Sequence, residues 1–130
     1  MIVERNMVGK GKGVTIIRDG NNLRLPMKFM LLEIEDRVSS RGAAIVAMPM
    51  STHPRHRDIL GAVMDCAIDK GLLITPRGGG RISVDDTNRV IKACDACVTF
   101  GPTDRVQVES ILRENFPGWQ IQVSIPKMRL

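Results

Sequence analysis

Residues 72–84, with the sequence LLITPRGGGRISV, place two short apolar runs on either side of three consecutive glycines. Both runs have the length and composition of buried strands, so this segment indicates a sheet. Glycine tolerates positive φ and lets another group come close to the backbone. The three glycines therefore form either a tight connection between two strands or a concave nest of N–H groups that holds an anion beside an arginine. The local sequence favours the connection, and the rest of the chain must decide between the two.

Further strands are expected on both sides of this segment. Residues 13–18 and 23–35 are predicted to pair as a hairpin, because two apolar runs flank the turn sequence DGNN at 19–22. Short apolar or alternating runs at 43–48, 89–101 and 119–125 predict the remaining strands.

Two segments have the spacing of amphipathic helices. Apolar residues recur at intervals of three and four from Pro54 to about Gly71, and a second helix is expected from about Thr103, its predicted N-cap, to Asn115. The order strands, helix, strands, helix, strand predicts an α+β fold. We expect a roughly six-stranded mixed or antiparallel sheet with two helices in a single domain.

Length and charge limit the class of protein. The chain has 130 residues, enough for one domain over residues 1–130, of which 1–12 are expected to form a flexible basic opening. A net charge of +5 and a pI near 9.6 favour an anionic partner. Three phenylalanines and one tryptophan, all scattered, do not make a base-stacking platform, so no dedicated nucleic-acid partner is expected.

The composition also bears on location. No segment is apolar over the thickness of a bilayer, and Glu4 and Arg5 interrupt any signal-peptide core, so no membrane partner is expected. Three cysteines in a chain without a secretion signal indicate reduced thiols. These features predict a cytoplasmic protein, which we expect to be a monomer.

Both histidines, His53 and His56, fall at the start of the first expected helix. The positive end of the helix dipole disfavours the imidazolium and keeps a ring there neutral, able to act as a base or nucleophile. The helical spacing turns His56 toward the sheet and leaves His53 at or before the cap. A purely structural histidine is the alternative. Lys28 is also unusual, because alternation places it on the buried face of its strand, where it either snorkels outward or points into a pocket.

Two other motifs are set aside. CDAC at 94–97 suggests a redox or zinc pair, but residues three apart on a strand point to opposite faces, and no second cysteine pair completes a zinc site. GKGKG at 9–13 lacks the spacing of a P-loop. We expect neither a metal nor a cofactor.

Four motifs together resemble the janus family, the small protein phosphohistidine phosphatases: HRDI at 56–59, GGGRIS at 78–83, FGP at 100–102 and ENFPGWQI at 114–121. In that family a histidine opens a helix, the triple glycine with its arginine follows at the same ungapped spacing, and an aromatic-Gly-Pro leads into the second helix. This chain departs from the family in the residues before the histidine and at Cys97, where the family has a serine. Between a tight connection and an anion-binding nest at the three glycines, the resemblance favours the nest, which together with its arginine forms a basic phosphate cradle.

The resemblance implies metal-independent hydrolysis of the P–N bond of phosphohistidine, or of phospholysine, in phosphohistidine-containing proteins. It makes His56 the catalytic residue and leaves Arg77, which lies outside the shared motif, facing solvent. It implies a phosphate-binding set made of Lys28, Gly78, Gly79, Gly80, Arg81, Cys97 and Thr99. The alternative is a non-catalytic module that holds phosphate or nucleic acid in the same basic cradle.

Overall fold

The computed structural model describes residues 14–16, 27–35 and 41–126 of the chain. These residues form two helices and the strands of one sheet. In chain order the elements are β1 Val14–Ile16, β2 Met27–Glu35, β3 Arg41–Met48, α1 His56–Asp69, β4 Leu73–Asp85, β5 Val90–Cys94, α2 Arg105–Asn115 and β6 Gln120–Ser124.

The sheet has six strands in the order β1-β3-β2-β4-β5-β6. The four inner strands pair antiparallel, and each edge strand runs parallel to its neighbour, so the sheet is mixed, as predicted. The predicted hairpin between residues 13–18 and 23–35 is wrong, because β3 lies between β1 and β2. Burial explains this order: residues 29–32 of β2 are buried on both faces of the sheet, which requires a long strand on each side. The predicted turn at 19–22 lies outside the described residues.

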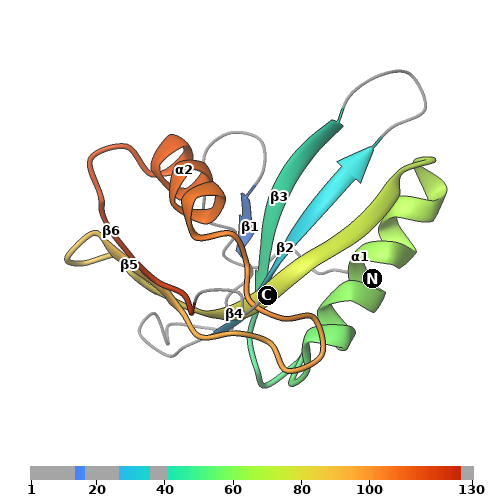
Figure 1. Ribbon diagram of the computed structural model, residues 1–130, viewed down its shortest axis with the longest axis horizontal. Coiled ribbons are helices and arrows are strands. Elements are labelled where there is room, and N and C mark those ends of the chain that lie inside the picture. The colour runs from blue at the N-terminus through green and yellow to red at the C-terminus, as the bar shows by residue number, and fades with distance from the viewer. Residues whose placement is uncertain (1–13, 17–26, 36–40, 127–130) are drawn as a thin grey trace.

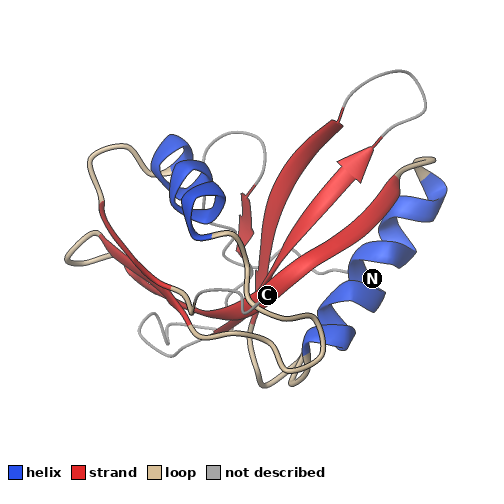
Figure 2. Ribbon diagram, viewed as in Figure 1, coloured by secondary structure: helices blue, strands red, loops and turns tan. Residues whose placement is uncertain are grey.

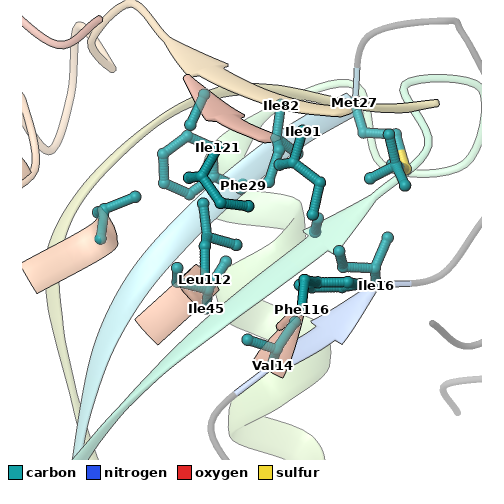
Figure 3. Packing of buried hydrophobic residues seen from close by; sticks show 14 of the residues in the cluster. Val14, Ile16, Met27, Phe29, Ile45, Ile82, Ile91, Leu112, Phe116 and Ile121 are labelled. Carbon is teal, nitrogen blue, oxygen red and sulfur yellow. The ribbon is translucent and has the colours of Figure 1, made fainter. Parts of the chain in front are cut away.

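The two helices cover opposite faces of the sheet, as Figures 1 and 2 show. Alternation along β2 divides its side chains between two hydrophobic clusters. Phe29 and Leu31 belong to the larger cluster, which α2 closes with Leu112 and Phe116 (Figure 3). Met30 and Leu32 belong to the smaller cluster under α1, together with Ile59 and Ala67. Lys28 therefore lies on the α1 face of the sheet.

Strand β4 runs without interruption through the three glycines. The prediction of two strands joined by a connection is therefore wrong. Pairing with β2 shifts register between Met30 and Leu32, which places an irregularity of β4 next to the glycines, and Gly78 has a φ of +110°. The glycines belong to a bent strand, not to a turn.

Two other boundaries differ from the sequence prediction. Strand β5 ends at Cys94, and residues 95–104 form a loop that a single bridge between Cys97 and Gly101 holds together. Helix α2 is capped by Asp104 and not by Thr103, because the Asp104 carboxylate accepts hydrogen bonds from the N–H groups of Val106 and Gln107 at 3.0 and 3.2 Å.

Candidate active site

His56 is the first residue of α1, and its ring lies against β4. The Nε2 atom is 2.9 Å from the carbonyl oxygen of Gly80. A carbonyl oxygen only accepts hydrogen bonds, so Nε2 carries the hydrogen of the neutral ring and Nδ1 carries the lone pair. Burial lowers the pKa of His56 below its ordinary value of 6.5, and the positive charges of Lys28 and Arg81 lower it further, while the bond to Gly80 acts in the opposite direction. The ring is thus neutral at pH 7, with Nδ1 free to act as a base or nucleophile.

The three glycines are needed because other groups pack directly against their Cα atoms. A Cβ at Gly79 would lie 2.6 Å from Cδ2 of His56, and one at Gly80 would lie 2.5 Å from the carbonyl oxygen of Cys94. At Gly78 a Cβ would meet the carbonyl oxygen of Pro102 at 2.6 Å. The glycines therefore let the start of α1, the end of β5 and the loop before α2 meet on one strand.

The glycines do not themselves line a pocket. The N–H of Gly79 is donated to the carbonyl of Gly101 at 3.1 Å, and its carbonyl accepts from the N–H of Cys97 at 3.0 Å. The N–H of Gly79 is therefore not free for the expected anion-binding nest, and the carbonyl of Gly80 is engaged by His56. Gly79 and Gly80 instead contact the His56 ring, Gly79 by packing and Gly80 through its carbonyl.

A pocket of about 310 Å³ opens beside His56 on the α1 face of the sheet. Figure 1 shows the loop after β5 passing close to the start of α1, and residues of both segments line the pocket. Apart from the three glycines, every residue predicted for the site lines this pocket. The lining consists of Lys28, Arg55, His56, Arg57, Arg81, Ala96, Cys97, Val98 and Thr99.

Positive charge dominates the pocket. Lys28 and Arg81 are direct partners in the β2–β4 register, so their side chains leave the same face of the sheet side by side. The Lys28 ammonium donates to the carbonyl of Pro54. Arg81 lies 3.7 Å from Asp95, and both side chains are more than half exposed, so this ion pair is weak and Arg81 is available to an incoming anion. With Arg55 and Arg57, four cations face the pocket and no carboxylate lines it.

The loop between β5 and α2 contributes backbone groups. Cys97 is buried, and hydrogen bonds to Gly79 and Gly101 fix its backbone. Within the described residues, the N–H groups of Val98 and Thr99 donate to no other backbone group. Val98 and Thr99 are both lining residues of the pocket, so their N–H groups are candidates to donate to a bound anion.

Two residues from the sequence analysis lie outside the pocket. His53 hydrogen-bonds through Nδ1 to the hydroxyl of Thr52 at 2.9 Å. Arg77 donates from Nε to the Glu33 carboxylate at 2.8 Å, and it does not line the pocket. The structure also places Arg55 and Arg57 in the lining, although the sequence analysis assigned neither of them to the site. Their position on either side of His56 was the signal for this role.

The cysteine pair behaves differently from its prediction. Cys94 ends β5, whereas Cys97 lies in the loop beyond Asp95, whose φ of +65° turns the chain, so the two are not on one strand. Both thiols are free, and burial together with Asp95 raises the pKa of Cys94. In the described part of the chain, no group of three or more His, Cys, Asp or Glu side chains is placed to hold a metal ion. No helix among the described residues is long and apolar enough to span a membrane.

The family model described as Janus/Ocnus family (Ocnus) matches residues 14–120, which is most of the chain. The chain belongs to the Janus/Ocnus family. A search of curated proteins finds no match. Every residue that lines the pocket of this Janus/Ocnus protein lies within the matched range.

The site of this Janus/Ocnus chain combines a neutral nitrogen base with an excess of positive charge. Lys28 and Arg81 can neutralise a doubly charged oxyanion, and the free N–H groups of the loop can orient it. Nδ1 of His56 can take a proton from a bound water or attack an electrophilic atom directly. A phosphoryl group carries the negative charge that the cations of this pocket can neutralise.

Proposed function

We propose that this protein is a metal-independent protein phosphohistidine phosphatase, able to act on phospholysine by the same chemistry. The observation that carries the proposal is the position of His56, which lines a pocket with four cations and is held through Nε2, so that Nδ1 keeps its lone pair. Its partners are phosphohistidine-containing proteins. The free thiols of Cys94 and Cys97 support a reducing, cytoplasmic setting for this activity.

In the proposed reaction, Lys28 and Arg81 hold the phosphoryl oxygens and neutralise their charge. The N–H groups of Val98 and Thr99 take a third oxygen. The P–N bond breaks with its electron pair passing to the imidazole nitrogen of the substrate, and solvent supplies the proton that this nitrogen then carries. In one route His56 Nδ1 removes a proton from the water that attacks phosphorus. In the other, Nδ1 itself bonds to phosphorus, and water hydrolyses the phosphorylated His56 in a second step.

Charge neutralisation by four cations is the function that metal ions perform in many phosphatases. The P–N bond is labile, so the protein needs to supply placement, charge neutralisation and one nitrogen base. Each of these has a named residue in the pocket. The proposal therefore expects full turnover in the presence of EDTA.

The second candidate function is a non-catalytic module that binds a phosphoprotein or nucleic acid in the same pocket. The net charge of +5 and the four lining cations favour it. A simple anion-binding module, however, does not need a neutral histidine with its lone pair free, and this distinguishes the phosphatase.

One experiment separates the two functions. Phosphate release from a phosphohistidine peptide is measured with EDTA present, in parallel with binding of generic duplex DNA over a range of salt concentrations. Turnover above the spontaneous rate supports the phosphatase. Absence of turnover together with DNA affinity that falls steeply with salt supports the binding module. Phosphohistidine is labile in acid, so an acid quench is unsuitable. A phosphorylated His56 is therefore sought by alkaline quenching and mass spectrometry.

A further inference from the structure

A second hollow lies on the sheet beyond the reach of α1. It has a volume of about 440 Å³ and contains no helix residue in its lining. Figure 1 shows α1 beside β4 and well away from β5 and β6, so α1 does not cover this part of the sheet. The lining consists of Ser83, Val84, Asp85, Asn88, Val90, Lys92 and Gln122. We call this hollow the sheet groove.

The sheet groove opens on the same face as the active-site pocket. Ile82 and Val84 point into the core under α2, so Arg81 and Ser83 point to the opposite side. Ser83 pairs with Lys92, and Lys92 pairs with Gln122, which forms one row of side chains across the groove. Arg81 and Lys28 form the neighbouring row, about 7 Å away along β4. A chain bound in the pocket can therefore continue directly into the groove.

The groove lining holds one cation, Lys92, and one carboxylate, Asp85, and these two charged residues differ in their local contacts. Lys92 is exposed and has no carboxylate partner among the described residues. The carboxylate of Asp85 accepts hydrogen bonds from the N–H groups of Thr87 and Asn88 and from the Asn88 amide, so it is held in the β4–β5 turn. Ser83 and Gln122 add neutral hydrogen-bonding groups beside Lys92. Such a lining suits a polar polypeptide with an acidic side chain.

We propose that the sheet groove binds the polypeptide segment that flanks the phosphohistidine, and that Lys92 selects an acidic residue in this segment. An extended chain advances by about 3.4 Å per residue, so a row 7 Å from Arg81 places the acidic residue about two to four positions from the phosphohistidine. This inference rests on the proposed phosphatase function and names its substrate class: phosphohistidine within an acidic sequence.

The test compares substrates with and without a flanking chain. Wild type and Lys92→Glu are assayed on free phosphohistidine, on a phosphohistidine peptide with aspartates at positions two to four on both sides, and on the same peptide with lysines there. Lys70→Glu is the matched control, because it makes the same charge change at the C-terminal end of α1, far from His56 at its start. Lys92→Gln shows whether loss of the charge is sufficient.

The expected result is a KM for the aspartate peptide that rises about tenfold in Lys92→Glu and less in Lys92→Gln, with kcat unchanged. Lys92→Glu also prefers the lysine peptide, whereas free phosphohistidine is hydrolysed equally by every variant. If the KM for the aspartate peptide equals that for the lysine peptide in wild type, and if neither KM changes in Lys92→Glu, the proposed binding of the flanking segment in the groove is wrong. If wild type hydrolyses none of the three substrates, the phosphatase function fails instead. The groove is then judged by the dissociation constant of the unphosphorylated aspartate peptide, which must rise in Lys92→Glu and stay the same in Lys70→Glu.

Discussion

The carbonyl of Gly80 determines which nitrogen of His56 is available. Many catalytic histidines are oriented by a carboxylate, which also stabilises the imidazolium. A neutral carbonyl on a central strand orients the ring without a full negative charge. Burial and the cations Lys28 and Arg81 therefore keep the ring neutral. This arrangement suits a site that binds a doubly charged group and still needs a lone pair on nitrogen.

The lowered pKa of His56 predicts the pH dependence of activity. The pKa of His56 in the free protein lies below its ordinary value of 6.5, so the acidic limb of kcat/KM is expected to have its midpoint below pH 6.5. The free energy of unfolding is also expected to decrease as the pH falls in this range. The reason is that His56 binds a proton more readily in the unfolded chain than in the folded protein. Initial rates corrected for spontaneous hydrolysis test this. An acidic limb centred above 6.5 would contradict it.

The two arginines beside the glycines are predicted to contribute unequally. Arg81→Ala is expected to lose about 2–4 kcal/mol of transition-state stabilisation, which corresponds to a fall of roughly 30- to 1,000-fold in kcat/KM, because it removes a preorganised charge from the pocket. Arg77→Ala is expected to change kcat/KM much less, because Arg77 is paired with Glu33 outside the pocket. Equal losses in the two variants would show that the pocket is assembled differently.

At the scale of elements, β4 brings the site together. The strand has three consecutive glycines where α1, β5 and the loop before α2 pack against it. A sequence alone shows three glycines and cannot show which groups lie against them, because those contacts are distant along the chain. For this reason the glycines could be assigned to the site, but their packing contacts could not be predicted, nor could the hydrogen bond by which the N–H of Gly79 is donated to Gly101.

Two glycine substitutions test this account of packing. Gly79→Ala is expected to destabilise the fold by about 1–3 kcal/mol and to reduce activity, because its Cβ would lie 2.6 Å from the His56 ring and 2.9 Å from the carbonyl oxygen of Phe29. Gly61→Ala in α1 is the control: its Cβ meets nothing within 4 Å, and alanine favours a helix interior by about 0.5–1 kcal/mol. Urea denaturation measures both. A fully stable, fully active Gly79→Ala would refute the packing role.

Local patterns predicted the helices well and strand pairing poorly. The stripe that includes Ile59 and Ala67 predicted α1 because a helix is built from contacts three and four residues apart. The end of α2 at Asn115 was also correct, but its cap was placed one residue early because Thr103 and Asp104 are both good N-caps. The predicted β1–β2 hairpin was wrong because strand pairing depends on contacts that are distant along the chain: the strand buried on both faces, β2, pairs with β3 and β4.

At the scale of the whole molecule, placing one helix on each face of the sheet determines where the site lies. Helix α1 covers only part of its face, so the cations on β2 and β4 emerge at its first residue, beside His56. The inward direction of Lys28 followed from alternation alone. Its proximity to Arg81 did not, because it depends on the register between two strands about fifty residues apart in the chain. The entry of Arg55 and Arg57 into the pocket likewise depended on how α1 docks.

The most direct test of the account is phosphate release from a phosphohistidine peptide, with EDTA present, by wild type, His56→Ala and His53→Ala. Both variants remove one imidazole from the same short region, but only His56 lines the pocket, whereas His53 bonds to Thr52 outside it. We predict that His56→Ala releases phosphate no faster than the spontaneous rate, while His53→Ala retains most of the wild-type rate and both remain folded. Turnover by folded His56→Ala at the wild-type rate, or equal loss in His53→Ala, would contradict the assignment of His56 as the catalytic residue.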